Sequence, residues 1–178
     1  MTTAPQTTAP HAAFKTQPAD PAWTERLLAR RTYAVIGTEN PDGSVHMTPL
    51  MYAFDGEVFL FESNTRTRKV RNLTARPRAR VLVQGPTDEP ESWVSAAGPT
   101  EIVTGQQAQE LNATIVARYA TEAGRRGWAA TMGPLDDVTI VLHPERWWSW
   151  DIGATLQVML DAGYTEAEVE GWFHPLDP

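Results

Sequence analysis

The sequence contains no cysteine. Disulfides, thiolate metal ligands and cysteine nucleophiles are therefore excluded, and the composition is compatible with the cytoplasm, where we expect the protein to reside. No apolar run approaches the roughly 20 residues that a membrane-spanning helix needs, so we expect no membrane segment. The chain also lacks a glycine-rich loop of the GxGxxG or GxxxxGK type, which argues against a classical dinucleotide site and a P-loop.

Residues with the usual catalytic spacings are also missing. The four histidines are scattered along the chain, and none are spaced like a pair of metal ligands, so we expect no metal site. No GxSxG motif is present, and no order of serine, histidine and aspartate indicates a hydrolase. The sequence therefore assigns no catalytic residue.

The balance of charge is acidic overall and basic in one place. The formal net charge is -7, which argues against a surface that coats nucleic acid. Seven of the 15 lysines and arginines nevertheless fall within 15 positions, between Arg66 and Arg80, and no acidic residue lies between Ser63 and Thr87. This segment is either a local anion site or a solvated basic helix face.

The 178 residues suggest one domain. Residues 1–20 are rich in Thr, Ala, Pro and Gln and have no apolar core, so we expect a disordered tail rather than a secretory signal. Residues 21–151 form the predicted domain. Residues 152–178 predict a helical extension of two short amphipathic helices, which packs on the domain or on a partner subunit.

Apolar periodicity predicts a mainly β domain. Strands are expected at 32–38, 44–54, 57–63, 78–85, 93–104 and 138–151, the fifth broken at Gly98-Pro99 and the sixth at His143-Pro144. Helices are expected at 21–31, 65–75 and 105–121, with an irregular or short helical stretch at 124–137. The first three strands are expected to form a meander. Six strands, with hairpins first, predict an antiparallel barrel with flanking helices.

The segment after the third strand carries the chemistry. Thr67, Arg68 and Lys69 fall in the first turn of the predicted helix, where a cation opposes the helix dipole and costs a few tenths to ~1 kcal/mol. An anion at that helix end would reverse this cost. Free backbone N–H groups, the hydroxyls of Ser63, Thr65 and Thr67 and the two cations would then converge on one phosphate.

These residues resemble a known family. The pattern Ser-Asn-x-x-Thr-Arg-Lys-x-Arg-x-Leu at 63–73, the NPDG turn at 40–43, Gly98 and the closing PERWWSWD at 144–151 are similar to the pyridoxamine 5′-phosphate oxidase-like, FMN-binding split-barrel superfamily, over about residues 22–151. The resemblance implies a six-stranded split β-barrel that forms a homodimer, with two flavins in clefts between the subunits. The segments TRKVRNL and HPERWWSWD resemble most the actinobacterial-type branch of this superfamily, whose members use FMN or a 5-deazaflavin coenzyme.

The resemblance also implies a set of cofactor contacts. The isoalloxazine edge would run along His46, Met47, Thr48, Pro49, Leu50 and Met51, mainly through backbone groups. Ser63, Thr67, Arg68 and Lys69 would hold the phosphate, Trp93 would lie near the ring, and Trp148 or Trp150 would cover it from the partner subunit. His46 and Met51 stand where the vitamin-forming oxidase has Arg and Lys, and its closing Arg-x-His motif is absent, so we do not expect vitamin B6 synthesis.

The expected function is oxidation or reduction of a small organic substrate with bound FMN, or with the 5-deazaflavin coenzyme. A non-catalytic flavin carrier or sensor and a haem binder on the same barrel are the alternatives. His46 could polarise a ring carbonyl or be an ordinary polar strand residue. Trp148 and Trp150 would share one face of their strand and Trp147 the other, so they could stack on the cofactor or pack in the core or at the dimer interface.

Overall fold

The computed structural model describes residues 21–86, 91–131 and 137–172. The predicted tail at 1–20 and the last residues of the predicted C-terminal extension lie outside these ranges. Within them, no helix is both long enough and apolar enough to cross a bilayer.

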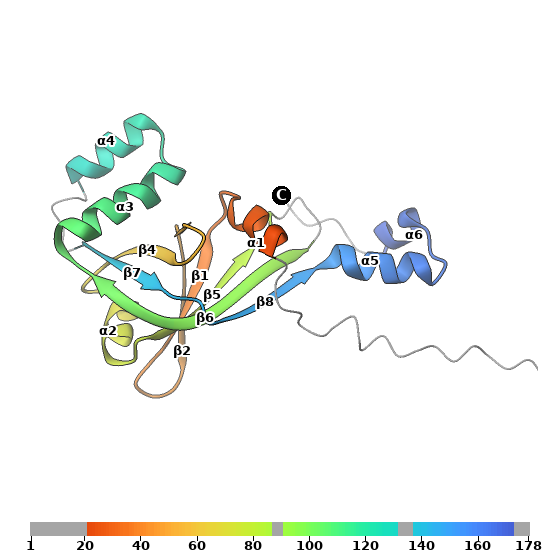
Figure 1. Ribbon diagram of the computed structural model, residues 1–178, viewed down its shortest axis with the longest axis horizontal. Helices are drawn as coiled ribbons and strands as arrows, with labels where there is room; N and C mark the ends of the chain where they lie inside the picture. The colour runs from red at the N-terminus through yellow and green to blue at the C-terminus, as the bar shows by residue number, and fades with distance from the viewer. Residues whose placement is uncertain (1–20, 87–90, 132–136, 173–178) are drawn as a thin grey trace, which may run out of the picture.

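Two antiparallel sheets form a half-barrel with helices at its ends and sides (Figure 1). One sheet has the order β2 (Val45–Leu50), β1 (Ala34–Glu39), β5 (Arg78–Gln84), the first half of β6 (Ser92–Val103) and β8 (Arg146–Asp151). The other has the second half of β6, then β7 (Asp137–Leu142), β4 (Phe59–Asn64) and β3 (Ala53–Phe54). The helices are α1 (Pro21–Leu28), α2 (Arg68–Ala75), α3 (Gly105–Tyr119), α4 (Glu122–Thr131), α5 (Ile152–Asp161) and α6 (Glu166–Glu170). The mainly β antiparallel fold predicted from the sequence is confirmed.

The strands differ from the prediction at two places. The segments expected as single strands at 44–54 and 138–151 are each two strands, so the described part of the chain has eight strands instead of six. The expected meander is also wrong in part, because β2 pairs with β1, whereas β4 pairs with β3 and β7. The chain changes sheets at Tyr52, whose fully buried side chain donates a hydrogen bond to the carbonyl of Leu28, 3.0 Å away, at the end of α1.

Strand β6 joins the two sheets. Residues before Gly98 pair with β8, and residues after Pro99 pair with β7. The break predicted at Gly98-Pro99 is therefore a position within one continuous strand. A Cβ atom at Gly98 would lie far inside contact distance of the carbonyl oxygen of His143, so the close approach of the two backbones requires glycine here.

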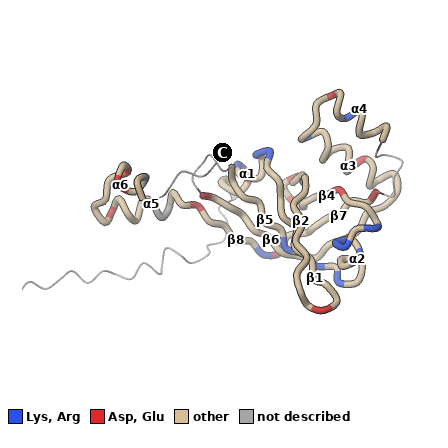
Figure 2. The backbone as a smooth tube through the Cα atoms, turned by 180° about the vertical axis from the view of Figure 1, so that it is seen from behind, with Lys and Arg blue, Asp and Glu red and all other residues tan. Residues whose placement is uncertain are grey.

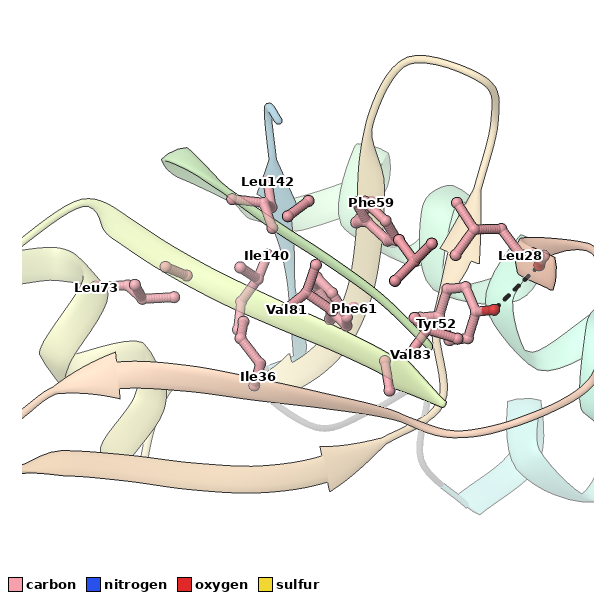
Figure 3. Close-up of a cluster of buried hydrophobic side chains, with 14 of the residues drawn as sticks. Leu28, Ile36, Tyr52, Phe59, Phe61, Leu73, Val81, Val83, Ile140 and Leu142 are labelled. Carbon is pink, nitrogen blue, oxygen red and sulfur yellow. Dashed lines mark hydrogen bonds between the residues drawn. The ribbon is translucent and has the colours of Figure 1, made fainter. Parts of the chain in front are cut away.

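The core fills the space between the two sheets (Figure 3). Its fully buried side chains include Ile36, Tyr52, Phe59, Phe61, Val81, Val83, Ile140 and Leu142. Helix α1 adds Leu28, and helix α2 adds Val70 and Leu73. A second cluster lies under α3, where Ile115 packs against the outer face of β4 and β7. The packing of Val70 and Leu73 in this core therefore holds α2 against the sheets, next to the end of β4.

The C-terminal hairpin of α5 and α6 extends beyond the end of β8 (Figure 1). Asp151 caps α5 by accepting a hydrogen bond from the N–H of Gly153, and Thr165 and Glu168 form the capping box of α6. Tyr164 and Trp172 contact each other edge to face across the hairpin and remain about half exposed, at 48% and 47%. The predicted pair of short helices is confirmed, while its predicted docking stays a prediction.

The bend in β6 generates a stability prediction. We expect Gly98→Ala to lower the free energy of unfolding by at least about 2 kcal/mol, because the methyl group forces the β6 and His143 backbones apart. Denaturant unfolding monitored by tryptophan fluorescence measures the change.

Gly127→Ala is the matched control, since this position lies in α4 and has open space around it. There the same substitution should leave stability unchanged or raise it by about 0.5–1 kcal/mol. Equal effects of the two substitutions would contradict the role given to Gly98.

Candidate functional site

A short turn, held by two hydrogen bonds to Asn64, joins the end of β4 to the N-terminus of α2. The side-chain oxygen of Asn64 accepts a hydrogen bond from the N–H of Arg66, at 2.8 Å. The backbone carbonyl of Asn64 accepts a second one from the N–H of Thr67, at 3.0 Å. Thr67 is the N-cap residue of α2, and its side chain makes no capping hydrogen bond. The first N–H groups of a helix have no partner within the helix, so this end of α2 offers unpaired donors.

Two hydroxyl groups meet at the same place. The side-chain oxygens of Ser63 and Thr67 are 3.0 Å apart, and Ser63 is buried. Because the hydroxyl of Thr67 donates to the carbonyl of Asn64, Ser63 is the donor in the bond to Thr67. The structure therefore brings together two of the predicted phosphate ligands.

The two predicted cationic ligands leave the helix start in different directions. Arg68 is exposed, and its charge acts on Asp42 in the β1–β2 turn, whose pKa is lowered mainly by hydrogen bonds from Ser44 and also by Arg68. Lys69 is half buried and lies toward Glu62 of β4; burial lowers its pKa, and the charge of Glu62 opposes that shift. Figure 2 shows the basic positions gathered around α2.

This donor set fits a phosphate. The first turn of α2 contains two cations and no acid, and no side chain caps its N–H groups. Such an end attracts an anion through both the helix dipole and the unpaired donors. Among the described residues, no group of three His, Asp or Glu side chains could hold a metal ion.

Glu62 interacts with the predicted site residue Lys69, although its position in the sequence did not single it out. Its pKa is raised to about 7, mainly by burial and also by the negative charge of Asp137 on β7, while the charge of Lys69 acts in the opposite direction. Its side chain is on the face of β4 that α3 covers, beside Leu60. The available signal was one acid directly after three apolar residues in the sequence FLFES.

Strand β2 divides the predicted ring contacts between two faces. His46 pairs with Thr38, which bonds to Asn72 of α2, so His46 and Thr48 are on the face toward α2. The His46 ring nitrogen Nε2 is 2.8 Å from the hydroxyl of Thr48. Met47 has the opposite orientation and is 62% exposed.

The remaining residues of this segment are structural or lie at the strand edge. Leu50 packs against the main core and Met51 against the second cluster. The side chain of Pro49 points to the opposite face of β2 from Leu50 and is exposed. Within the described chain, β2 pairs with β1 alone, so alternate backbone N–H and C=O groups along its free edge are open to a ligand.

The predicted tryptophans lie on the outward face of the first sheet. Trp93 is opposite Trp150, and Trp148 is opposite Ser95, so all three tryptophans share this face. Trp147 points the other way and packs against Phe54 and Phe59, with ring centroids 5.8 and 5.6 Å away. The predicted alternation of the cluster is confirmed.

An open groove of about 770 Å³ runs across this outward face. Two of the predicted site residues, Met47 and Trp93, line it. Strands β2 and β8 are the opposite edges of the sheet, with three strands between them, and four steps of ~4.8 Å separate them by about 19 Å. One chain therefore does not bring Trp148 and Trp150 to the predicted ring contacts along β2.

The chain belongs to the pyridoxamine 5′-phosphate oxidase family, which matches residues 21–151. This match confirms the resemblance drawn from the sequence. No curated protein matches the chain.

Solved structures give the same fold. An F420 reductase is 30% identical, with 69% of this chain and 94% of that chain covered and a TM-score of 0.56. The conserved hypothetical protein Rv2991 of Mycobacterium tuberculosis is 23% identical, with coverages of 80% and 90% and a TM-score of 0.66. A pyridoxamine 5′-phosphate oxidase-related, FMN-binding protein of Nostoc punctiforme is 16% identical, with coverages of 85% and 86% and a TM-score of 0.51.

The environment of Glu62 generates a pH prediction. Its pKa is about 7 in the folded chain against an ordinary value of 4.5, so the unfolded chain ionises first as the pH rises between these values. Glu62 therefore costs stability above pH 4.5, and fully so above pH 7. We expect Glu62→Gln to raise the free energy of unfolding at about pH 8 by about 1–2 kcal/mol, a value reduced for solvent screening, and to lose this advantage near about pH 4.

Urea unfolding at the two pH values measures the difference. Glu57→Gln, at an exposed position in the turn before β4, removes the same charge without relieving burial and serves as the control. A gain for Glu62→Gln that is the same at both pH values would show that charge burial is not its cause.

Proposed function

We propose that the protein is an oxidoreductase that binds FMN, or the 5-deazaflavin coenzyme, between the subunits of a homodimer and acts on a small organic substrate. The observation that supports the proposal is the N-terminus of α2, where N–H groups without a side-chain cap, the paired hydroxyls of Ser63 and Thr67 and two cations occur within one strand end and one helical turn. A phosphate group would accept hydrogen bonds from these N–H groups and would be attracted by both cations.

The position of β2 supports the orientation of the cofactor. Asn72 of α2 donates hydrogen bonds to Thr38 and Asn40, at 3.1 and 2.9 Å, and so ties the phosphate site to the β1–β2 hairpin. A cofactor with its phosphate at α2 would lay its ring along the free edge of β2, where backbone donors and acceptors would bind the ring edge. His46 and Thr48 face the same side.

The distance across the sheet supports the homodimer. The tryptophans of β8 are about 19 Å from the edge strand β2 of the same chain, so they would reach the ring only from a second subunit. The outward face also exposes Val45 and Met47, at 64% and 62%. Burial of such apolar side chains is a common driving force for association.

The bound cofactor would supply the hydride-transfer chemistry. The chain's own residues would bind the phosphate, hold the ring against β2 and exclude water with the aromatic face of the partner. Relatives named as an F420 reductase and as an FMN-binding protein support both cofactor choices. The visible spectrum distinguishes them, because an oxidised flavin has two visible bands and a deazaflavin has one. Turnover of the reduced cofactor with an acceptor distinguishes an enzyme from a carrier.

The phosphate site is tested by removing its charges. The double variant Arg68→Ala with Lys69→Ala should lose two charge-assisted contacts, together worth about 3–6 kcal/mol, which raises the Kd for FMN roughly 10²- to 10⁴-fold. Riboflavin has no phosphate and should bind both proteins alike. Fluorescence titration of both ligands measures the two affinities.

The control is Arg26→Ala with Arg125→Ala, which removes the same charge from exposed positions on α1 and α4, away from the start of α2. FMN binding should be nearly unchanged in this variant. If both double variants weaken FMN equally, the effect is one of overall charge and the site assignment fails.

The interface is tested at an exposed apolar position. Val45 is 64% exposed, so Val45→Glu should leave the subunit folded while it places a charge in the proposed interface. We expect a shift from dimer to monomer in sedimentation velocity, together with weaker FMN binding because the partner's tryptophans are lost.

Val158→Glu on α5 is the control for a charge at a similarly exposed valine. A wild-type protein that sediments as a monomer with FMN bound would refute the shared site.

A further inference from the structure

The groove on the outward face has a floor of small residues. Gly37 of β1 and Ser95 of β6 lie within it, and Val45, Met47 and Trp93 form apolar walls. Because Val45 and Met47 also belong to the proposed subunit interface, the groove would lie between the two subunits of the proposed dimer. Its volume of about 770 Å³ falls within the range of ligand pockets. The groove is thus suited to a flat apolar body.

Two arginines of β5 enter this groove, and they differ in their partners. Arg78 forms an ion pair with Glu145, with nitrogen and oxygen 2.6 Å apart. Within the described chain, no carboxylate lies at ion-pair distance from Arg80, although both arginines are exposed. The acid Glu39, which also lines the groove, is paired with Arg76 at 3.2 Å. Glu91 also lines the groove. Arg80 therefore brings a positive charge without an ion-pair partner in the described chain into a groove whose walls are mainly apolar.

Arg80 has a defined position because Trp148 holds it. The guanidinium carbon lies 4.4 Å from the centroid of the Trp148 ring, a cation–π contact across β6. Arg146 approaches the same ring at 5.8 Å. A guanidinium that stacks through its flat face keeps its N–H edge free for planar, paired hydrogen bonds to a carboxylate.

We propose that Arg80 binds the anionic group of an aromatic carboxylate substrate whose flat body fills this groove. The proposal rests on the proposed function, since it names the substrate class of that oxidoreductase. The substrate's charge would be separate from the cofactor phosphate, which α2 would hold on the other side of β2.

Calorimetric titration of the full chain saturated with FMN, with naphthalene-1-carboxylate and naphthalene-1-carboxamide as probes, tests the assignment. These probes share one aromatic body and differ in charge. We expect the wild type to bind the carboxylate at least about tenfold more tightly than the amide, as one charge-assisted contact predicts. Arg80→Gln should abolish this preference, and Arg78→Gln, two residues away on the same face, should retain it.

Three results would overturn the proposal: no preference in the wild type, a preference that survives in Arg80→Gln, or an equal loss in Arg78→Gln. FMN affinity should be unchanged in Arg80→Gln, and a parallel loss would assign Arg80 to the cofactor instead. The titration is repeated without FMN, because carboxylate preference there depends on the groove alone. The FMN titration thus tests the phosphate site at Arg68 and Lys69, and the carboxylate preference without FMN tests the role of Arg80, so the two proposals can fail independently.

Discussion

The close approach of two backbones at Gly98 is the constraint on which the rest of the architecture depends. Because a glycine there lets β6 pass directly over the carbonyl of His143, one strand pairs with β5 and β8 in its first half and with β7 in its second. The same contact separates β7 from β8 and sends the latter to the outer edge of the first sheet. The strands β2 and β8 then become opposite edges of the first sheet, and only the proposed second subunit would bring the tryptophans of β8 to the edge of β2.

The start of α2 is locally unfavourable in several respects. Two cations occupy the positive end of the helix, the hydroxyl of Thr67 donates to the carbonyl of Asn64 and does not cap the helix, and half-buried Glu62 near Lys69 has its pKa raised to about 7, mainly by burial. A chain selected for stability alone would replace each of these features. Their concentration over one turn and one strand end is the usual pattern of a ligand site, where stability is exchanged for binding.

What could be predicted from the sequence was mostly local. The basic start of α2, the capping box at Thr165 and the alternation of Trp147 with Trp148 depend on spacing along the chain, and the structure shows each of them. The rest depends on partners distant in sequence. Tyr52 breaks the expected meander because α1 and α3 bind it, Glu62 is buried by α3, and Arg80 meets Trp148 only through the register of β5, β6 and β8. Whether Arg68 and Lys69 bind a phosphate stays a prediction.

The hairpin of α5 and α6 has a practical value because the sequence has no cysteine. Val158 is 45% exposed on α5, and the hairpin stands beyond β8, on the opposite side of the molecule from α2 (Figure 1). Val158→Cys would therefore create a unique thiol for a fluorescent label, without a background of native thiols and without touching the helix start where the phosphate is proposed to bind. In an assembly of two chains, energy transfer between two such labels would report the distance between the two α5–α6 hairpins.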